Sequence, residues 1–150
     1  METRASPSQP LYGLECKAAW CERILSGEKS LEIRAYPPPP ELAGQRVLLL
    51  ASSGEEGVAA FGDAIEAGQA GGSVVGWVLF DGAAAVEYAS GEAFAADAAV
   101  HCVPADSPYA YREGGPALYG WPVVASHRFA ELQPLPAMRR LMRSVYKRQG

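Results

Sequence analysis

The stretch that decides the fold is Gly27-Glu28-Lys29-Ser30-Leu31-Glu32-Ile33-Arg34. It follows a short amphipathic run, Trp20 to Leu25, which the glycine closes. From the lysine onward, polar and apolar residues alternate as they do along a β-strand, so Ser30, Glu32 and Arg34 share one face. Opposite charges on one strand face, beside a lysine at a helix–strand corner, are unusual in a protein core. We therefore predict a cleft that holds a polar ligand.

Hydrophobic spacing places further elements on both sides of this stretch. The expected strands are residues 11–14, 29–36, 46–51, 74–80, 83–88 and 119–129. The expected helices are residues 17–26, 55–67, 90–96 and 136–148. Many short strands with few helices predict an α+β fold, built as a small barrel or strongly bent mixed sheet with a few flanking helices. Trp77 lies in a strongly apolar strand and is expected in the core.

Length and composition indicate one ordinary globular domain. The chain has 150 residues, of which 49% are apolar and 20% are charged, so it can bury a sizeable core. We expect a flexible leader over residues 1–10, the domain over residues 11–140 and a basic tail over residues 141–150. No apolar run approaches the ~20 residues that a membrane helix needs. The N-terminus lacks the apolar stretch of a secretory signal, so a cytoplasmic or nuclear location is expected.

Cysteine and histidine usage argues against metal sites and disulfides. The three cysteines, Cys16, Cys21 and Cys102, have no CxxC spacing, and the only histidines are His101 and His127. Structural zinc and a disulfide framework are therefore not expected, whereas buried reduced thiols are. We expect no metal and no cofactor.

Charge is distributed unevenly along the chain. All 17 acidic residues lie at or before Glu131, whereas five of the 13 basic residues lie after it, in the last twelve positions. A strongly acidic body argues against a large nonspecific nucleic-acid footprint. The basic C-terminal segment leaves room for local phosphate contacts.

The order of these motifs resembles the ASCH family, a branch of the PUA-like β-barrel superfamily. The family hallmark G-x-K-x-x-E-x-R is matched by four residues at the same spacing, Gly27, Lys29, Glu32 and Arg34. Trp20 precedes the glycine by seven positions, as a tryptophan commonly does in the family, and Tyr119-Gly120-Trp121 resembles the closing strand. The resemblance spans about residues 12–140, nearly the whole chain. It implies a PUA-like β-barrel.

The resemblance implies, first, a module that binds RNA or a nucleotide. Lys29 and Arg34 would hold phosphate, Glu32 would read a polar edge, and aromatic residues would stack an unpaired base. A small cleft admits one unstacked base or a single-stranded end rather than a duplex. Protein partners in a larger complex are compatible with this role. The expected ligand contacts are Trp20, Lys29, Ser30, Glu32, Arg34, Tyr119 and Trp121, and a polar loop adds Tyr109 and Tyr111.

The resemblance implies, as an alternative, a small amidohydrolase acting on N4-acetylcytidine or a related acylated nucleoside. The family hydrolases carry a nucleophilic threonine where this chain has Glu32, so here the glutamate would activate water. Lys29 would act as the base and Glu87 as a second carboxylate, which makes these three the candidate catalytic residues. Ribonuclease activity is a further alternative in the same family, and nothing in the two histidines supports an acid–base pair for it.

Each of these residues also has an ordinary structural interpretation. A lysine at a helix–strand corner is usually solvated, and Glu32 with Arg34 can form a surface ion pair worth about 0–1 kcal/mol. Glu87 can be an exposed glutamate at the edge of a sheet. A structure in which Lys29, Glu32, Arg34 and Glu87 converge would favour a functional site.

Overall fold

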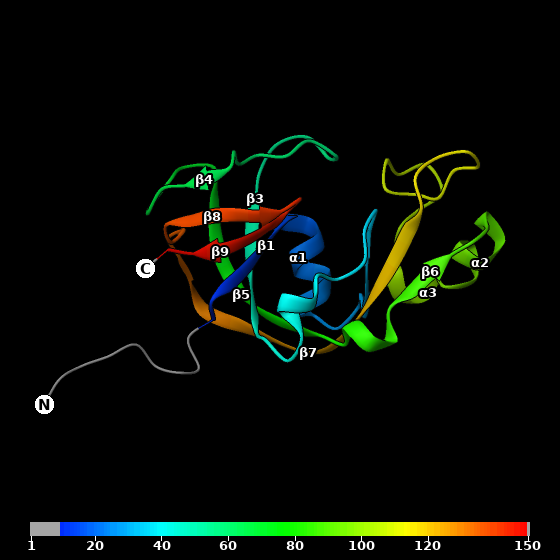
Figure 1. Cartoon of the computed structure of the whole chain (residues 1–150), viewed down its shortest axis with the longest axis horizontal. Coiled ribbons are helices and arrows are strands. Elements are labelled where there is room, and N and C mark those ends of the chain that lie inside the picture. Colours follow the sequence, from blue (N-terminus) through cyan, green and yellow to red (C-terminus); the bar gives the residue numbers. More distant parts are fainter. Residues whose placement is uncertain (1–9, 150) are drawn as a thin grey trace, which may run out of the picture.

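The computed structural model describes residues 10–149, and its main feature is a mixed β-sheet (Figure 1). The strands are β1 (Tyr12–Lys17), β2 (Leu31–Arg34), β3 (Val47–Ser52), β4 (Ala64–Ile65), β5 (Gly72–Phe80), β6 (Val86–Tyr88), β7 (Leu118–Gln133), β8 (Met138–Met142) and β9 (Val145–Arg148). Their order in the sheet is β2-β7-β5-β3-β1-β9-β8-β4, and β6 pairs with β7 off this path. Apart from Pro10, the leader expected over residues 1–10 lies outside the described residues.

The sheet is open. β1 and β3 are parallel, from Tyr12 opposite Val47 to Lys17 opposite Ser52, and the other pairings of the described strands are antiparallel. Within residues 10–149, β2 and β4 stand at the two ends of the strand order and do not pair with each other. The chain is thus a small α+β domain, mostly sheet with few helices, as the sequence predicts in outline. The predicted barrel is not confirmed, because these pairings leave the sheet open.

The helical elements are short. They are α1 (Ala18–Leu25), α2 (Gly91–Ala96), α3 (Ala98–His101) and the 3-10 turns η1 (Pro40–Leu42) and η2 (Gly82–Ala84). The predicted helices over residues 17–26 and 90–96 are confirmed. α1 ends before Gly27, whose φ of 85° is tolerated most easily by glycine, and Ser90 caps α2 through its hydroxyl oxygen. In the described part of the chain, no helix has the length and apolar character needed to span a membrane.

Two predicted helices are wrong. Residues 55–67 form turns followed by the two-residue strand β4, because glycines such as Gly57, with φ of 80°, interrupt the run. Residues 136–148 form the β8–β9 hairpin instead of a basic helix. Val145 and Tyr146 are fully buried there, because β9 pairs with β1 in the middle of the sheet. The basic C-terminal segment is therefore part of the sheet.

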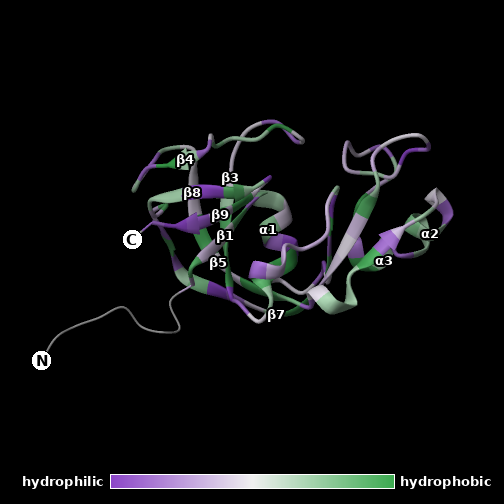
Figure 2. Cartoon of the chain, in the orientation of Figure 1, coloured by the Kyte–Doolittle hydropathy of each residue, from purple (hydrophilic) through white to green (hydrophobic). Residues whose placement is uncertain are grey.

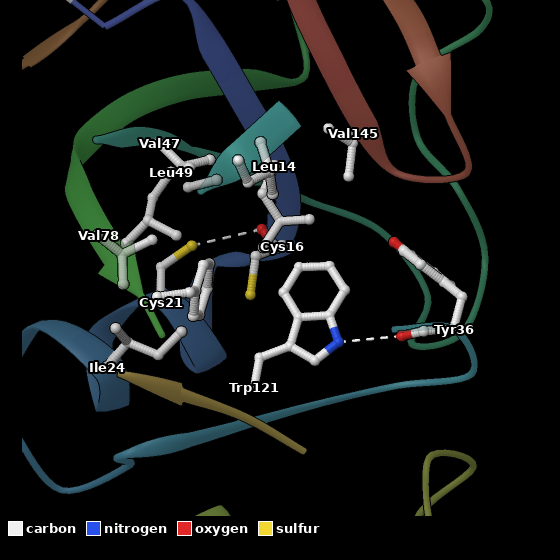
Figure 3. Packing of buried hydrophobic residues seen from close by; sticks show 13 residues of the cluster. Leu14, Cys16, Cys21, Ile24, Tyr36, Val47, Leu49, Val78, Trp121 and Val145 are labelled. Carbon is white, nitrogen blue, oxygen red and sulfur yellow. Dashed lines mark hydrogen bonds between the residues drawn. The ribbon is translucent and has the colours of Figure 1, made fainter. Parts of the chain in front are cut away.

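The main core lies between one face of the sheet and α1 (Figure 3). Leu14 of β1 and Leu49 of β3 meet Ile24 of α1 on this face. Trp121 of β7 is fully buried in the same cluster, where its Nε1 donates to the Tyr36 carbonyl oxygen at 2.9 Å. The indole also makes an edge-to-face contact with Tyr36 at 5.5 Å between ring centroids. Trp121 is therefore a core residue, and the prediction that it contacts a ligand is not supported by its position.

Apolar residues gather on the central strands and leave the loops more polar (Figure 2). A second cluster, on the opposite sheet face, includes Leu50, Phe61 and Tyr146. Trp77 also lies away from the main core, so the prediction that it is a core residue is wrong. It is only partly buried, and the guanidinium of exposed Arg46 lies over its ring at 4.5 Å from the centroid.

Candidate functional site

A cavity of about 530 Å³ opens where β1, β2, two long loops and the β8–β9 turn meet. Its size falls in the range of small-molecule sites. The charged side chains that line it are Glu15, Lys17, Lys29, Glu32, Arg34, Arg112, Arg140 and Arg143. Six are basic and two are acidic, in a chain whose formal net charge is −4. The cavity therefore concentrates positive charge within an acidic protein.

The turn before β2 and the alternation of residues along it place the polar side chains of this strand at the cavity. After the turn at Gly27, the Lys29 N–H donates to the Arg23 carbonyl oxygen at 2.9 Å, which fixes the entry into the strand. Leu31 and Ile33 then pack into a third apolar cluster with residues of α2 and β7. Alternation leaves the side chains of residues 32 and 34 on the cavity side. Glu32 and Arg34 thus share one face as predicted, with Leu31 and Ile33 on the other, whereas Ser30 precedes the strand and does not line the cavity.

Lys29 is buried rather than solvated. Only 2% of its surface is exposed, and its Nζ donates to the carbonyl oxygen of His101. Nζ also lies 3.7 Å from Glu32 Oε1 and 4.8 Å from the centroid of the Trp20 ring. Burial lowers the pKa of this amine below its ordinary value of 10.5, although the neighbouring carboxylate partly opposes the shift. The interpretation of Lys29 as an ordinary surface lysine is therefore wrong.

Glu32 and Arg34 form a close ion pair on the cavity wall. Glu32 Oε2 accepts from Arg34 Nε at 2.9 Å and lies 2.7 Å from Arg34 Nη2. Nη2 also donates to the Glu15 carbonyl oxygen at 3.0 Å, which ties β2 to β1. Burial is the largest single effect on the guanidinium of Arg34 and opposes its charge, but Glu32 together with Tyr36 and Cys16 more than offsets burial, so the pKa is raised. With Lys29 on Oε1, both oxygens of Glu32 are already engaged.

Two aromatic rings form one wall of the cavity. Trp20 and Tyr109 meet edge to face at 6.0 Å between centroids. Trp20 Nε1 donates to Glu56 Oε2 at 2.9 Å, and the Tyr109 hydroxyl accepts from the Gly57 N–H at 2.8 Å. Burial raises the pKa of this phenol to about 12. Tyr111 is not part of the lining, and its hydroxyl bonds to a backbone carbonyl outside the cavity.

Five predicted site residues do not line the cavity within residues 10–149: Ser30, Glu87, Tyr111, Tyr119 and Trp121. Ser30 is exposed just before β2. Glu87 of β6 is exposed and pairs in register with Tyr119 of β7. Trp121 is enclosed in the core. The structure thus brings Lys29, Glu32 and Arg34 together and leaves Glu87 elsewhere.

The cavity also contains residues that the sequence analysis did not single out for the site. Glu15 is 5% exposed on β1 and shares its strand face with Lys17. The charged alternation of residues 15 and 17 in an otherwise apolar strand is the signal that could have found them. Arg140 of β8 and Arg143 of the β8–β9 turn also line the cavity, so the basic C-terminal segment reaches it as part of a hairpin.

Comparison of the chain with protein-family models, with curated proteins and with solved structures found no significant match. The resemblance to the ASCH family therefore rests on the sequence motif alone and stays a prediction.

Proposed function

We propose that this chain is an ASCH-type domain of the PUA-like superfamily that binds RNA or a nucleotide in the cytoplasm or nucleus. An unpaired base or a nucleotide would enter the cavity built around residues 27–34. The observation that carries the proposal is the excess of basic over acidic residues on the cavity wall of an acidic chain. Positive charge in a concave site favours an anionic ligand.

The cavity offers a different partner for each part of a nucleotide. The exposed Arg143 is available to phosphate at the mouth, and the exposed Arg112 has guanidinium N–H groups left beside those that donate to the Ala110 and Ser107 carbonyl oxygens. Trp20 and Tyr109 supply ring surface for a base. A volume of about 530 Å³ suits one unstacked base, and a duplex would need a broader surface. This arrangement supports a single-stranded or mononucleotide ligand.

The test is binding of a short single-stranded RNA at about 50 and 200 mM salt, compared between matched arginine variants. We expect Arg143→Ala to weaken binding. We also expect the negative slope of log affinity against log salt to become shallower by about 0.7, the value for one single-strand phosphate contact. Arg139→Ala is the matched control, because Arg139 is exposed on β8 and outside the cavity lining. Absence of binding by the unaltered protein, or an equal loss in both variants, would contradict the proposal.

One observation favours hydrolysis of an acylated nucleoside as a second candidate function. The amine of Lys29 is buried, its pKa is lowered, and it lies next to the Glu32 carboxylate. When Lys29 has lost its proton, its amine can take a proton from water as water attacks the acyl carbonyl. The resulting ammonium can return that proton to the leaving nitrogen as the C–N bond breaks, which gives the free amine and the acid. The exposed position of Glu87 leaves it outside this step.

Incubation with N4-acetylcytidine tests this candidate through the release of cytidine and acetate. Release that is lost in Lys29→Met and kept in Lys147→Met, an exposed lysine of β9 outside the cavity lining, would support hydrolysis. If the unaltered protein releases neither product, this candidate fails and the binding proposal remains.

A further inference from the structure

One carboxylate oxygen of a residue that lines the cavity has no hydrogen-bond partner among the described residues. Glu15 is 95% enclosed on β1, and its Oε2 accepts from the Ala60 N–H at 2.8 Å. The same Oε2 lies 3.7 Å from Lys17 Nζ. Its other oxygen, Oε1, is buried without a hydrogen-bond partner among residues 10–149. A buried acceptor that has lost water without gaining a donor costs free energy, so such atoms call for a specific explanation.

Glu15 differs in this respect from Glu32, the other carboxylate of the cavity. Glu32 has Lys29 on one oxygen and Arg34 on the other, so it has little capacity left for a ligand. Glu15 has one oxygen held by the Ala60 N–H and one that accepts no hydrogen bond from residues 10–149. The fixed oxygen orients the carboxylate, because the Ala60 N–H belongs to the backbone of the loop over the cavity. Of these two carboxylates, Glu15 is therefore the one whose oxygen can still accept a hydrogen bond from a ligand.

The surroundings of this oxygen restrict the kind of donor that it can take. Six basic side chains line the same cavity, so a cationic ligand would be repelled. A neutral N–H or O–H group carried by an anionic molecule can donate to Oε1, and the basic side chains would attract rather than repel that molecule. In a nucleotide, the base is the planar part that can go deep, while the phosphate stays with the exposed Arg112 and Arg143. The donor nearest to a buried wall is then on the base.

We propose that Glu15 Oε1 accepts a hydrogen bond from the exocyclic amino group of a bound base. This inference rests on the proposed nucleotide function and adds a preference to it. A carboxylate only accepts hydrogen bonds, so a base with an exocyclic amino group, such as cytosine or adenine, fits. Uracil and hypoxanthine carry a carbonyl at the same position, which would place two acceptors face to face. The site therefore prefers CMP over UMP and AMP over IMP.

The first test is calorimetric titration of the unaltered protein with these two pairs of monophosphates. We expect a preference of about tenfold or more for the amino-bearing member of each pair, the size of one hydrogen bond to a charged group. Comparison of CMP with dCMP shows whether the donor is on the base or on the sugar, because the 2′-hydroxyl of ribose is another neutral donor. Equal binding of CMP and UMP, or a loss confined to dCMP, would overturn the inference and leave nucleotide binding intact. Absence of binding by every nucleotide would overturn both proposals.

The second test inverts the preference. In Glu15→Gln, the amide oxygen can keep the bond from the Ala60 N–H, which leaves the amide NH₂ at the position of Oε1. We expect this variant to bind UMP more tightly than CMP. Glu131→Gln, an exposed residue outside the cavity lining, is the matched control and should keep the original order. A folded Glu15→Gln protein that still prefers CMP would refute the role of Glu15, and if the variant does not fold, the first test decides alone.

Discussion

Neutralising Glu32 should destabilise the protein strongly, because its carboxylate stands between the buried Lys29 and the partly buried Arg34. Oε1 lies 3.7 Å from Lys29 Nζ, and Oε2 lies 2.7 Å from Arg34 Nη2. Removing one partner of a buried ion pair costs about 3–5 kcal/mol, since the remaining charge is left without compensation. Glutamine keeps an oxygen for Arg34, so we place Glu32→Gln at the lower limit, about 3 kcal/mol. For a chain of this length that corresponds to a fall in Tm of about 10 °C.

The assay is urea unfolding followed by circular dichroism, with Glu131→Gln as the matched control. The control should change the free energy of unfolding by no more than about 0.5 kcal/mol, because Glu131 is exposed. Adding Lys29→Met to Glu32→Gln should recover part of the loss, because the uncompensated ammonium is then gone. A Glu32→Gln loss no larger than that of the control, or no recovery in the double variant, would refute the reasoning.

Three further expectations concern the scaffold. Gly76→Ala would place a Cβ 2.1 Å from the His127 carbonyl oxygen. We expect it to lower the free energy of unfolding by about 3 kcal/mol in urea titrations. An unchanged free energy of unfolding would show that the backbone moves freely and would contradict this expectation. Trp121→Phe leaves the Tyr36 carbonyl oxygen without its indole donor. We expect the free energy of unfolding to fall by about 2 kcal/mol in the same assay, and a fall of less than about 0.5 kcal/mol would contradict this. Burial lowers the pKa of His101 below 6.5, so the unfolded chain binds the proton first and stability contributed by this group falls as pH drops below 6.5. An NMR titration that finds the His101 imidazole protonated at pH 6.5 or above would contradict this.

Elements with a strong local signal could be predicted from the sequence. The apolar run 46–51 is β3, and the amphipathic residues 17–26 contain α1. The hairpin over residues 138–148 was not predictable in the same way. Its basic residues fit a solvated helix face as well as a strand, and Val145 becomes buried only because a distant strand pairs with β9.

The candidate site was predictable where one short segment determines it. Spacing along β2 places Glu32 and Arg34 together, and the structure adds Lys29 at the corner. The choice of aromatic residues was not predictable, because β7 has 16 residues and its pairing with β5 shifts register twice. Alternation alone therefore does not say that Trp121 enters the core. The alternation of Glu15 with Lys17 was a signal in the sequence, but the enclosure of Glu15 depends on a distant loop whose Ala60 N–H bonds to its carboxylate.

The placement of β1 has a consequence for how the chain is synthesised. β1 is among the first described segments to leave the ribosome, yet one of its two neighbours, β9, is among the last, with Tyr12 opposite Lys147. One edge of β1 must therefore stay unpaired until residues 145–148 have been synthesised. An exposed strand edge invites pairing with another chain. A nascent chain that stalls before residues 145–148 would present that edge to its neighbours on the same polysome.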